Sequence, residues 1–274
     1  MRQLLRDVVS FANETTSLSN CLIRNDRILF VMTGNQLKIL ALITMTIDHI
    51  GVVLLPQYLI LRIIGRLTYP IFAYMIAEGC FYTRSKKRYL GGIFALGFAC
   101  QIGFFLAMGS LEQSILTSFV LAIITIYAIQ LADDHKGIVG ALAVVGALAL
   151  DVFVALVLPV FLAGTDFSID YGFWGIMLPV FCYMPRIFFK KALDKKRLRI
   201  MLAFACLGII LVCVQMNDWL GGIQWFSLLA IVPLASYNGK RGTWHLKYLF
   251  YIYYPAHLVA IWGAAELLGY FSAM

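Results

Sequence analysis

Charged residues are scarce in this chain. Of its 274 residues, 13% are Asp, Glu, Lys or Arg and 62% are hydrophobic, which gives a mean hydropathy of +0.86. A soluble protein of this size carries roughly a quarter of charged residues to cover its surface. This composition excludes a water-exposed globular domain, and it predicts an integral membrane protein whose exterior contacts lipid.

Segments of alternating polar and apolar residues, which mark the strands of a transmembrane barrel, are also missing. The apolar runs are instead continuous and about twenty residues long, which is the length of a membrane-spanning helix. Because every backbone polar group in lipid must be hydrogen-bonded internally, these runs predict an all-α fold. We predict a polytopic membrane protein with nine transmembrane helices, at residues 36–55, 58–82, 89–108, 114–132, 138–162, 171–189, 200–216, 219–236 and 247–271.

Motifs of several common chemistries are absent as well. The chain contains no HExxH, P-loop, GxSxG or EF-hand pattern. Its six cysteines form no CxxC pair and lie mostly in apolar runs, so they indicate small hydrophobic residues rather than a metal site or disulfides. No repeat of fixed period is visible, which disfavours solenoids and the internal repeats of many transporters.

The basic residues have a one-sided distribution. The net charge is +8, but it does not indicate nucleic acid, because the basic residues occupy the short loops between apolar runs. All but two of the 22 Lys and Arg residues fall on the side of the N-terminus. The positive-inside rule places that side in the cytoplasm and, with nine spans, the C-terminus outside. We expect a multi-pass protein of the plasma membrane.

Two regions follow from this pattern. Residues 1–35 are predicted to form a cytoplasmic segment, in which residues 2–13 place their apolar side chains on one helical face and lie on the membrane surface. Residues 36–274 are predicted to form the membrane domain.

The two remaining basic residues, Arg62 and Arg66, lie inside the second predicted span. An ionisable group within the bilayer is costly and marks a functional site by default. The two arginines are four residues apart and share a helix face. Asp48 and His49 lie in the first span, roughly 18–20 Å from its cytoplasmic end, at about the depth of Arg66. A short connection makes these spans antiparallel neighbours, so we predict an Asp48–Arg66 ion pair beside His49.

A second polar cluster lies in the last predicted span. Tyr253, Tyr254 and His257 are three and four residues apart, which places both tyrosines on the helix face of His257. His257 falls near mid-membrane, where a structural hydrogen-bonding role is as plausible as a catalytic one. Glu78, near the cytoplasmic end of the second span, is expected to face the basic loop at residues 84–88.

Three sequence blocks carry a family resemblance. They are LKILALITMTIDHIG (37–51), LRIIGRLTYPIFAYMIAEG (61–79) and YNGKRGTWHLKYLFYIYYPAHL (237–258). Together they resemble the TraX family, named for a membrane protein that acetylates the N-terminus of conjugative pilin. The resemblance extends over residues 36 to about 260. It implies a transmembrane acyltransferase related to heparan-alpha-glucosaminide N-acetyltransferase, which passes an acetyl group from cytosolic acetyl-CoA to an acceptor on the far side.

The polar residues fit the needs of acyl transfer. A base must take a proton from the acceptor, and His49 is the first candidate, as base or as transient acyl carrier, with His257 in reserve. Arg62 and Arg66 could stabilise the developing oxyanion or anchor Asp48. The coenzyme A phosphates of the acetyl-CoA donor need cations on the cytoplasmic side. The predicted donor-binding residues are Asn238, Lys240, Arg241 and Tyr254, and no metal is predicted.

Other functions stay open. Asp48, Arg62, Arg66 and His257 could instead line the path of a transporter or flippase, and a non-enzymatic assembly subunit is a third possibility. The acceptor is left open between a protein N-terminus, a glycan and a lipid. The clustering of a base and arginines at one depth favours the enzyme.

Overall fold

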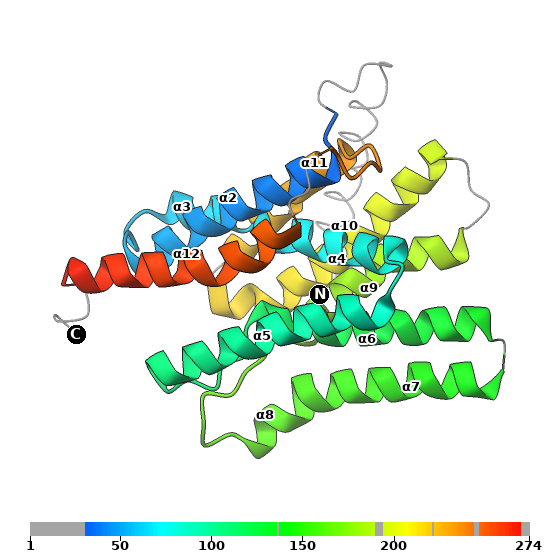
Figure 1. Cartoon of the computed structure of the whole chain (residues 1–274), viewed down its shortest axis with the longest axis horizontal. Coiled ribbons are helices and arrows are strands. Elements are labelled where there is room, and N and C mark those ends of the chain that lie inside the picture. The colour runs from blue at the N-terminus through cyan, green and yellow to red at the C-terminus, as the bar shows by residue number, and fades with distance from the viewer. Residues whose placement is uncertain (1–30, 136, 190–193, 221, 244–246, 270–274) are drawn as a thin grey trace.

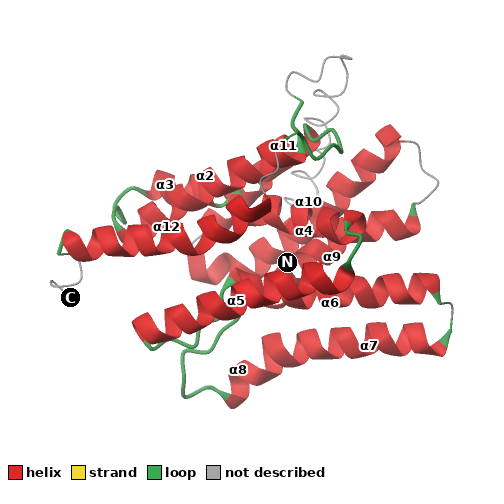
Figure 2. Cartoon of the chain, in the orientation of Figure 1, coloured by secondary structure: helices red, strands yellow, loops and turns green. Residues whose placement is uncertain are grey.

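The chain is entirely helical wherever its structure is described. The computed structural model describes residues 31–135, 137–189, 194–220, 222–243 and 247–269 (Figure 1). Within these ranges every regular element is a helix and no strand occurs (Figure 2), which confirms the all-α prediction. The predicted surface helix at residues 2–13 lies outside the described residues.

Each predicted span coincides with one helix or with consecutive helices. The elements are α2 (Gly34–Val53), α3 (Leu59–Gly65), α4 (Thr68–Tyr82), α5 (Lys86–Met108), α6 (Ile115–Asp134), α7 (Ile138–Val152), the π-helix η1 (Phe153–Val157), α8 (Leu158–Phe161), α9 (Gly172–Phe188), α10 (Asp194–Leu220), the 3-10 helix η2 (Ile223–Ala230), α11 (Ile231–Ala235) and α12 (Lys247–Leu267).

Several of these helices can cross a membrane. Among the described residues, six helical stretches are long and apolar enough to do so, as expected for a multi-pass membrane protein. Two further apolar helices, Gly172–Phe188 and Ile223–Ala235, are shorter. The total of nine spans and the cytoplasmic N-terminus stay predictions. The six stretches are α2, α3 with α4, α5, α6, α7 through α8, and residues 198–217 of α10.

The second predicted span is broken, which corrects the prediction of one continuous helix. At the break, the N–H groups of Arg66 and Leu67 donate to carbonyls three residues back, at 3.2 and 3.3 Å. Such a tightened turn inside a long helix often marks a functional site. Here it places Arg66 at the junction of α3 and α4.

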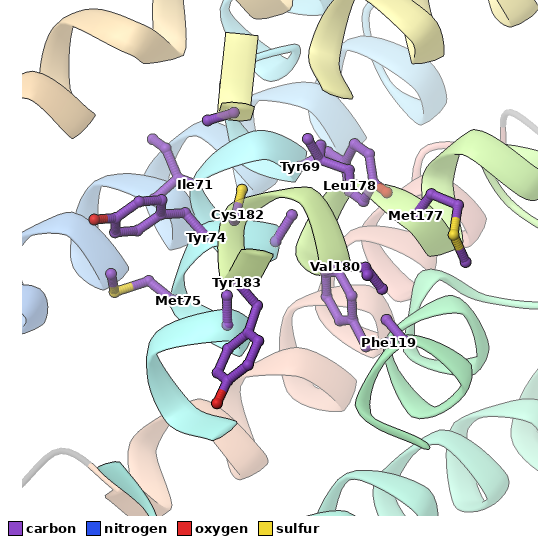
Figure 3. Close-up of a cluster of buried hydrophobic side chains, with 14 of the residues drawn as sticks. Tyr69, Ile71, Tyr74, Met75, Phe119, Met177, Leu178, Val180, Cys182 and Tyr183 are labelled. Carbon is purple, nitrogen blue, oxygen red and sulfur yellow. The ribbon is translucent and has the colours of Figure 1, made fainter. Parts of the chain in front are cut away.

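The centre of the bundle is built by α4, α6, α9 and α10, which pack on one another. Figure 3 shows α4 meeting α9 through Tyr69, Tyr74 and Cys182, all of which are buried. In contrast, α7 lies at the edge of the bundle (Figure 1), and both α5 and α7 expose most of their side chains. Lipid rather than protein therefore covers much of these two helices.

The loop at residues 237–242 is tied to the start of α2. The N–H groups of Gly34 and Asn35 donate to the carbonyls of Lys240 and Arg241, at 2.8 and 2.9 Å. Gly242 has a φ of +92°, and a Cβ there would lie 3.0 Å from the Thr33 hydroxyl, so glycine suits both the backbone and the space. The block at residues 237–258 thus contacts the residues that directly precede the block at residues 37–51.

At the opposite end, two loops are joined through Gln113. Its N–H donates to Ser168 at 2.8 Å, and its carbonyl accepts from Asp170 at 3.2 Å. Hydrogen bonds from the Ser110 hydroxyl and the Leu111 N–H hold the pKa of Asp166 below its usual range. These contacts fix residues 166–171, which lead directly into α9.

Candidate functional site

A three-membered charge cluster joins α2 to the α3–α4 junction. Arg66 donates to both carboxylate oxygens of Asp48 at 2.9 Å, so the predicted ion pair is present. Arg62 contacts the same carboxylate at 2.9 Å, which sequence reasoning had left open. Because arginine stays protonated in proteins, two cations on one carboxylate leave the cluster with one excess positive charge.

The cluster is shielded and tightly packed. The Arg66 side chain is 5% exposed and that of Asp48 is 17% exposed. Arg66 also donates to the Gln224 carboxamide at 3.2 Å, which connects η2 to the cluster. A Cβ on Gly65 would overlap the Asp48 carboxyl group, so glycine at this position lets Asp48 reach both arginines.

The two histidines of the predicted first and last spans lie against each other. The ring centroids of His49 and His257 are 5.0 Å apart with an interplanar angle of 73°. His49 Nδ1 lies 2.8 Å from the Met45 carbonyl, and His257 Nδ1 lies 3.0 Å from the Tyr253 carbonyl. A carbonyl can only accept, so we assign the proton of each neutral ring to Nδ1. Each Nε2 is thereby left with a lone pair, the form that a base or nucleophile requires.

His257 is surrounded by its own helix and by α2. Its ring stacks on Tyr253 at 5.4 Å and meets the edge of Tyr254 at 5.7 Å. The Tyr253 hydroxyl lies 2.6 Å from that of Thr46, which ties α12 to α2. His257 Nε2 is buried and has no hydrogen-bond partner among the described residues, so its lone pair is unused.

A cavity of about 620 Å³ runs along the inner side of α2. Lys38 and His49 both line it and are eleven residues apart in one helix, so the cavity extends over roughly 16 Å of helix axis. Its polar residues gather toward the two ends, and apolar side chains from α4, α5, α6 and α12 lie between them. The polar lining toward the start of α2 is Asn35, Lys38, Glu78, Tyr237 and Arg241; toward the histidines it is Asp48, His49, Thr68, Asp170 and Tyr171.

The cavity end at the start of α2 has two cations, Lys38 and Arg241, for which no ion pair with a carboxylate is found among the described residues. Glu78 forms an ion pair with Arg186 of α9 and accepts from the Tyr237 hydroxyl at 3.0 Å. The expectation that Glu78 faces the basic loop at residues 84–88 was wrong, because α9 supplies a closer partner. With Glu78 neutralised, Lys38 and Arg241 are left as cavity-lining cations.

The cavity end beside the histidines contains a strained residue. Tyr171 has a φ of +60° and is the one non-glycine residue with positive φ in the described ranges; such strain often accompanies a functional site. Its ring stacks on Tyr69 at 4.0 Å. Next to it, burial and the Glu112 carboxylate raise the pKa of Asp170 to about 7, against the opposing effect of Arg66.

The predicted site residues fall into two groups. Asp48, His49, Arg241 and Tyr254 line the cavity, whereas Arg62, Arg66, His257, Asn238 and Lys240 lie behind or beside its lining. Asn238 accepts the Lys240 N–H at 2.9 Å, so it shapes the loop. Among the described residues, no group of three or more His, Cys, Asp or Glu is arranged to hold a metal ion.

Sequence reasoning missed several residues of this site. From the sequence, Lys38 was treated only as one of the basic residues near the first predicted span. Its position within the first turn of that span was a signal that it belongs to the site. The Glu78–Arg186 pair joins residues 108 positions apart, and Gln224 reaches Arg66 across 158 positions. No local sequence pattern predicts such long-range contacts.

Fold and site together define an all-helical, multi-pass membrane protein in which two histidines and an arginine-bound carboxylate adjoin an internal cavity. The TraX protein family model matches residues 33–265, and the chain belongs to this family.

Two relatives are similar to this chain over different lengths. The "Probable fimbrial assembly protein FimC, serogroup H1" of Dichelobacter nodosus is 24% identical over 249 residues, which cover 85% of this chain and 96% of that protein. An uncharacterized protein of Rickettsia prowazekii (strain Madrid E) is 50% identical over 52 residues, or 19% of this chain and 21% of that protein. No solved structure matches the chain.

Proposed function

We propose that this protein is a membrane acyltransferase that moves an acetyl or other acyl group from cytosolic acyl-CoA to an acceptor on the outer side of the plasma membrane. The observation that carries the proposal is the continuous cavity between two cations, Lys38 and Arg241, and the imidazole of His49. A phosphorylated donor held by the cations would extend its acyl end toward the imidazole.

The chemistry assigned to His49 follows from its tautomer. With the Nδ1 proton held by the Met45 carbonyl, Nε2 can take the proton of the acceptor nucleophile or attack the thioester carbonyl carbon itself. When Nε2 acts as the base, it passes the acceptor's proton to the sulfur as the C–S bond breaks, and coenzyme A leaves as the thiol. When Nε2 attacks, the sulfur leaves with the electron pair of the C–S bond, and the acceptor that later displaces the imidazole supplies the proton that makes it a thiol. His257 Nε2 is close enough to be the alternative base.

Asp48 and its two arginines are assigned a supporting role. Neither Arg62 nor Arg66 lines the cavity, and both bind the Asp48 carboxylate. Of the two roles considered for the arginines, anchoring Asp48 therefore fits better than direct contact with an oxyanion. The excess positive charge of the cluster still favours negative charge that develops beside His49.

The orientation belongs to the same proposal. Nine spans with the N-terminus in the cytoplasm place the Lys38–Arg241 end inside, where coenzyme A is available, and His49 in the outer half of the membrane. The basic loops support this arrangement through the positive-inside rule.

A role in pilus assembly is the second candidate function. It is favoured by the printed name of the Dichelobacter relative, a fimbrial assembly protein, and it is compatible with acylation of a pilus subunit or with assembly without catalysis. A transporter is favoured less, because the cavity residues reported above form no repeated arrangement in the sequence.

The direct test uses purified protein in lipid nanodiscs with acetyl-CoA as the probe. We expect calorimetric binding of acetyl-CoA and release of free coenzyme A thiol at a rate above that of empty nanodiscs. Binding without thiol release, even when amine acceptors are added, would favour transport. Absence of both would leave the assembly role.

A further inference from the structure

Two helices that line the cavity, α5 and α12, have few backbone contacts with each other. They run along the same side of the molecule (Figure 1), yet α5 packs mainly on α6 and α12 on α2. Contact between α5 and α12 along this seam is therefore made mainly by side chains.

One tyrosine fills the seam. Tyr251 of α12 lines the cavity, and its hydroxyl lies 3.0 Å from the position that a Cβ on Gly92 of α5 would take. The absence of a side chain at Gly92 makes the space that Tyr251 occupies. The neighbouring side chains Ile252 and Phe94 are 66% and 56% exposed, so the lipid-facing surface begins immediately beside Tyr251.

The helix turn that holds Tyr251 is weakened by Pro255. Proline has no N–H, so the Tyr251 carbonyl lacks the helical donor four residues further on. Prolines are also common sites of helix bending. Within the same turn, the Tyr253 hydroxyl lies 2.6 Å from that of Thr46, which ties this part of α12 to α2. The missing helical hydrogen bond therefore loosens the backbone at Tyr251, while Tyr253 stays attached to α2.

The interior behind the seam suits hydrocarbon. Between the polar ends, the cavity is lined by Phe72, Met75, Ile93, Leu96 and Phe119. If the Tyr251 side chain is displaced, an alkyl chain that passes through its position would contact these apolar side chains along its whole length. A transmembrane peptide helix, about 10–12 Å across with its side chains, is too wide for the same gap.

We propose that the cavity is entered sideways from the bilayer, through the seam between α5 and α12, by the alkyl chain of a membrane amphiphile. The Tyr251 side chain blocks this entrance and moves aside to open it. In the closed state it occupies the space that the missing side chain of Gly92 leaves. Resting on the acyltransferase function proposed above, the amphiphile is the acyl acceptor: its nucleophilic head lies at His49 while its tail extends past Tyr251 into lipid.

The entrance can be tested without any transfer activity. The full-length chain, with its six cysteines replaced and a single reporter Leu42→Cys in the cavity wall, is placed in nanodiscs. Labelling rates are measured with N-dodecylmaleimide, which dissolves in the bilayer, and with a charged methanethiosulfonate in the water. Tyr251→Ala should raise the dodecylmaleimide rate several-fold, and Tyr251→Leu should raise it less. Ile252→Ala, whose side chain faces lipid, is the matched control and should have no effect.

Two results would overturn the lateral entrance. One is a dodecylmaleimide rate that Tyr251→Ala does not raise. The other is an equal rise for the charged reagent, which would mean that the seam leads to water. Should Tyr251→Ala fail to fold, the Tyr251→Leu measurement decides between the same outcomes.

The acceptor class is tested with two amines, dodecylamine and propylamine, and acetyl-CoA. In each transfer the amine nitrogen bonds to the acetyl carbon as the C–S bond breaks. His49 takes the proton that the nitrogen loses and passes it to the sulfur, so coenzyme A leaves as the thiol. We expect dodecylamine to be preferred and Tyr251→Ala to alter its rate alone. Equal use of both amines, unaffected by Tyr251→Ala, would refute a lipid-linked acceptor. Acetylation of neither amine, with labelling as expected, would refute the enzyme while the entrance stands.

Discussion

At the scale of single residues, the site depends on which ring nitrogens of its histidines are free. Both Nδ1 atoms donate to backbone carbonyls of their own helices, so each Nε2 atom carries a lone pair that can accept a proton. Only His49 combines a free Nε2 with a place in the cavity wall. This difference makes His49 a stronger candidate for the base than His257. The sequence suggested the same order but gave no structural reason for it.

Gly65→Ala tests how closely Asp48 is packed. The added methyl group would overlap the Asp48 carboxyl and should destabilise the protein by about 1–3 kcal/mol, as overpacking usually does. The measurement is the loss of folded protein on heating in detergent. Gly91→Ala is the matched control, because no atom lies within 4 Å of its added methyl group. A Gly65→Ala variant as stable as Gly91→Ala would contradict the described packing.

From the raised pKa of Asp170 we predict that the stability of the folded protein depends on pH. Burial raises its pKa to about 7, whereas the unfolded chain has a value of about 3.9. A raised carboxyl pKa stabilises the folded state at low pH, and this contribution is lost as the pH rises from about 4 to about 7. The melting temperature of the wild type should therefore fall over that range relative to Asp170→Asn. Parallel curves for the two proteins would show that Asp170 does not titrate in this way.

At the scale of elements, the sequence predicted the helices well because spanning segments of about twenty apolar residues leave the backbone no alternative in lipid. The Asp48–Arg66 pair was also predictable, since a short hairpin fixes the relative depth of two neighbouring helices. The break at Arg66 and Leu67 was missed, although Pro70, which has no N–H to donate to the Arg66 carbonyl four residues back, marks it in the sequence. The Glu78–Arg186 pair requires knowing that α4 packs on α9.

The two cations of the loop at residues 237–242 can be compared by their effects on acetyl-CoA binding. Arg241 lines the cavity and Lys240 does not, although sequence reasoning treated them alike. Arg241→Ala should weaken acetyl-CoA binding about 10-fold, the usual effect of losing a charge-assisted hydrogen bond, and Lys240→Ala should weaken it less. The difference should shrink as salt rises. Equal effects in a direct binding assay would move the donor site out of the cavity mouth.

At the scale of the whole molecule, the account requires the two cavity ends to face opposite sides of the membrane. Ser168 lies in the loop that Gln113 joins near the outer end. A single cysteine at Ser168 should react with an impermeant thiol reagent added to intact cells. Reaction only after permeabilisation would invert the orientation, and with it the assignment of the donor side.

The proposed mechanism requires His49 to perform the transfer at the end of the cavity. The rate of coenzyme A release from acetyl-CoA is measured for His49→Ala in nanodiscs, with binding of acetyl-CoA measured in parallel. We expect unchanged binding and a release rate lower by about 10²–10⁴-fold, the usual effect of removing a positioned base. His257→Ala is the companion variant. Near-normal release by His49→Ala, with release abolished in His257→Ala, would contradict the claim and move the reaction to α12.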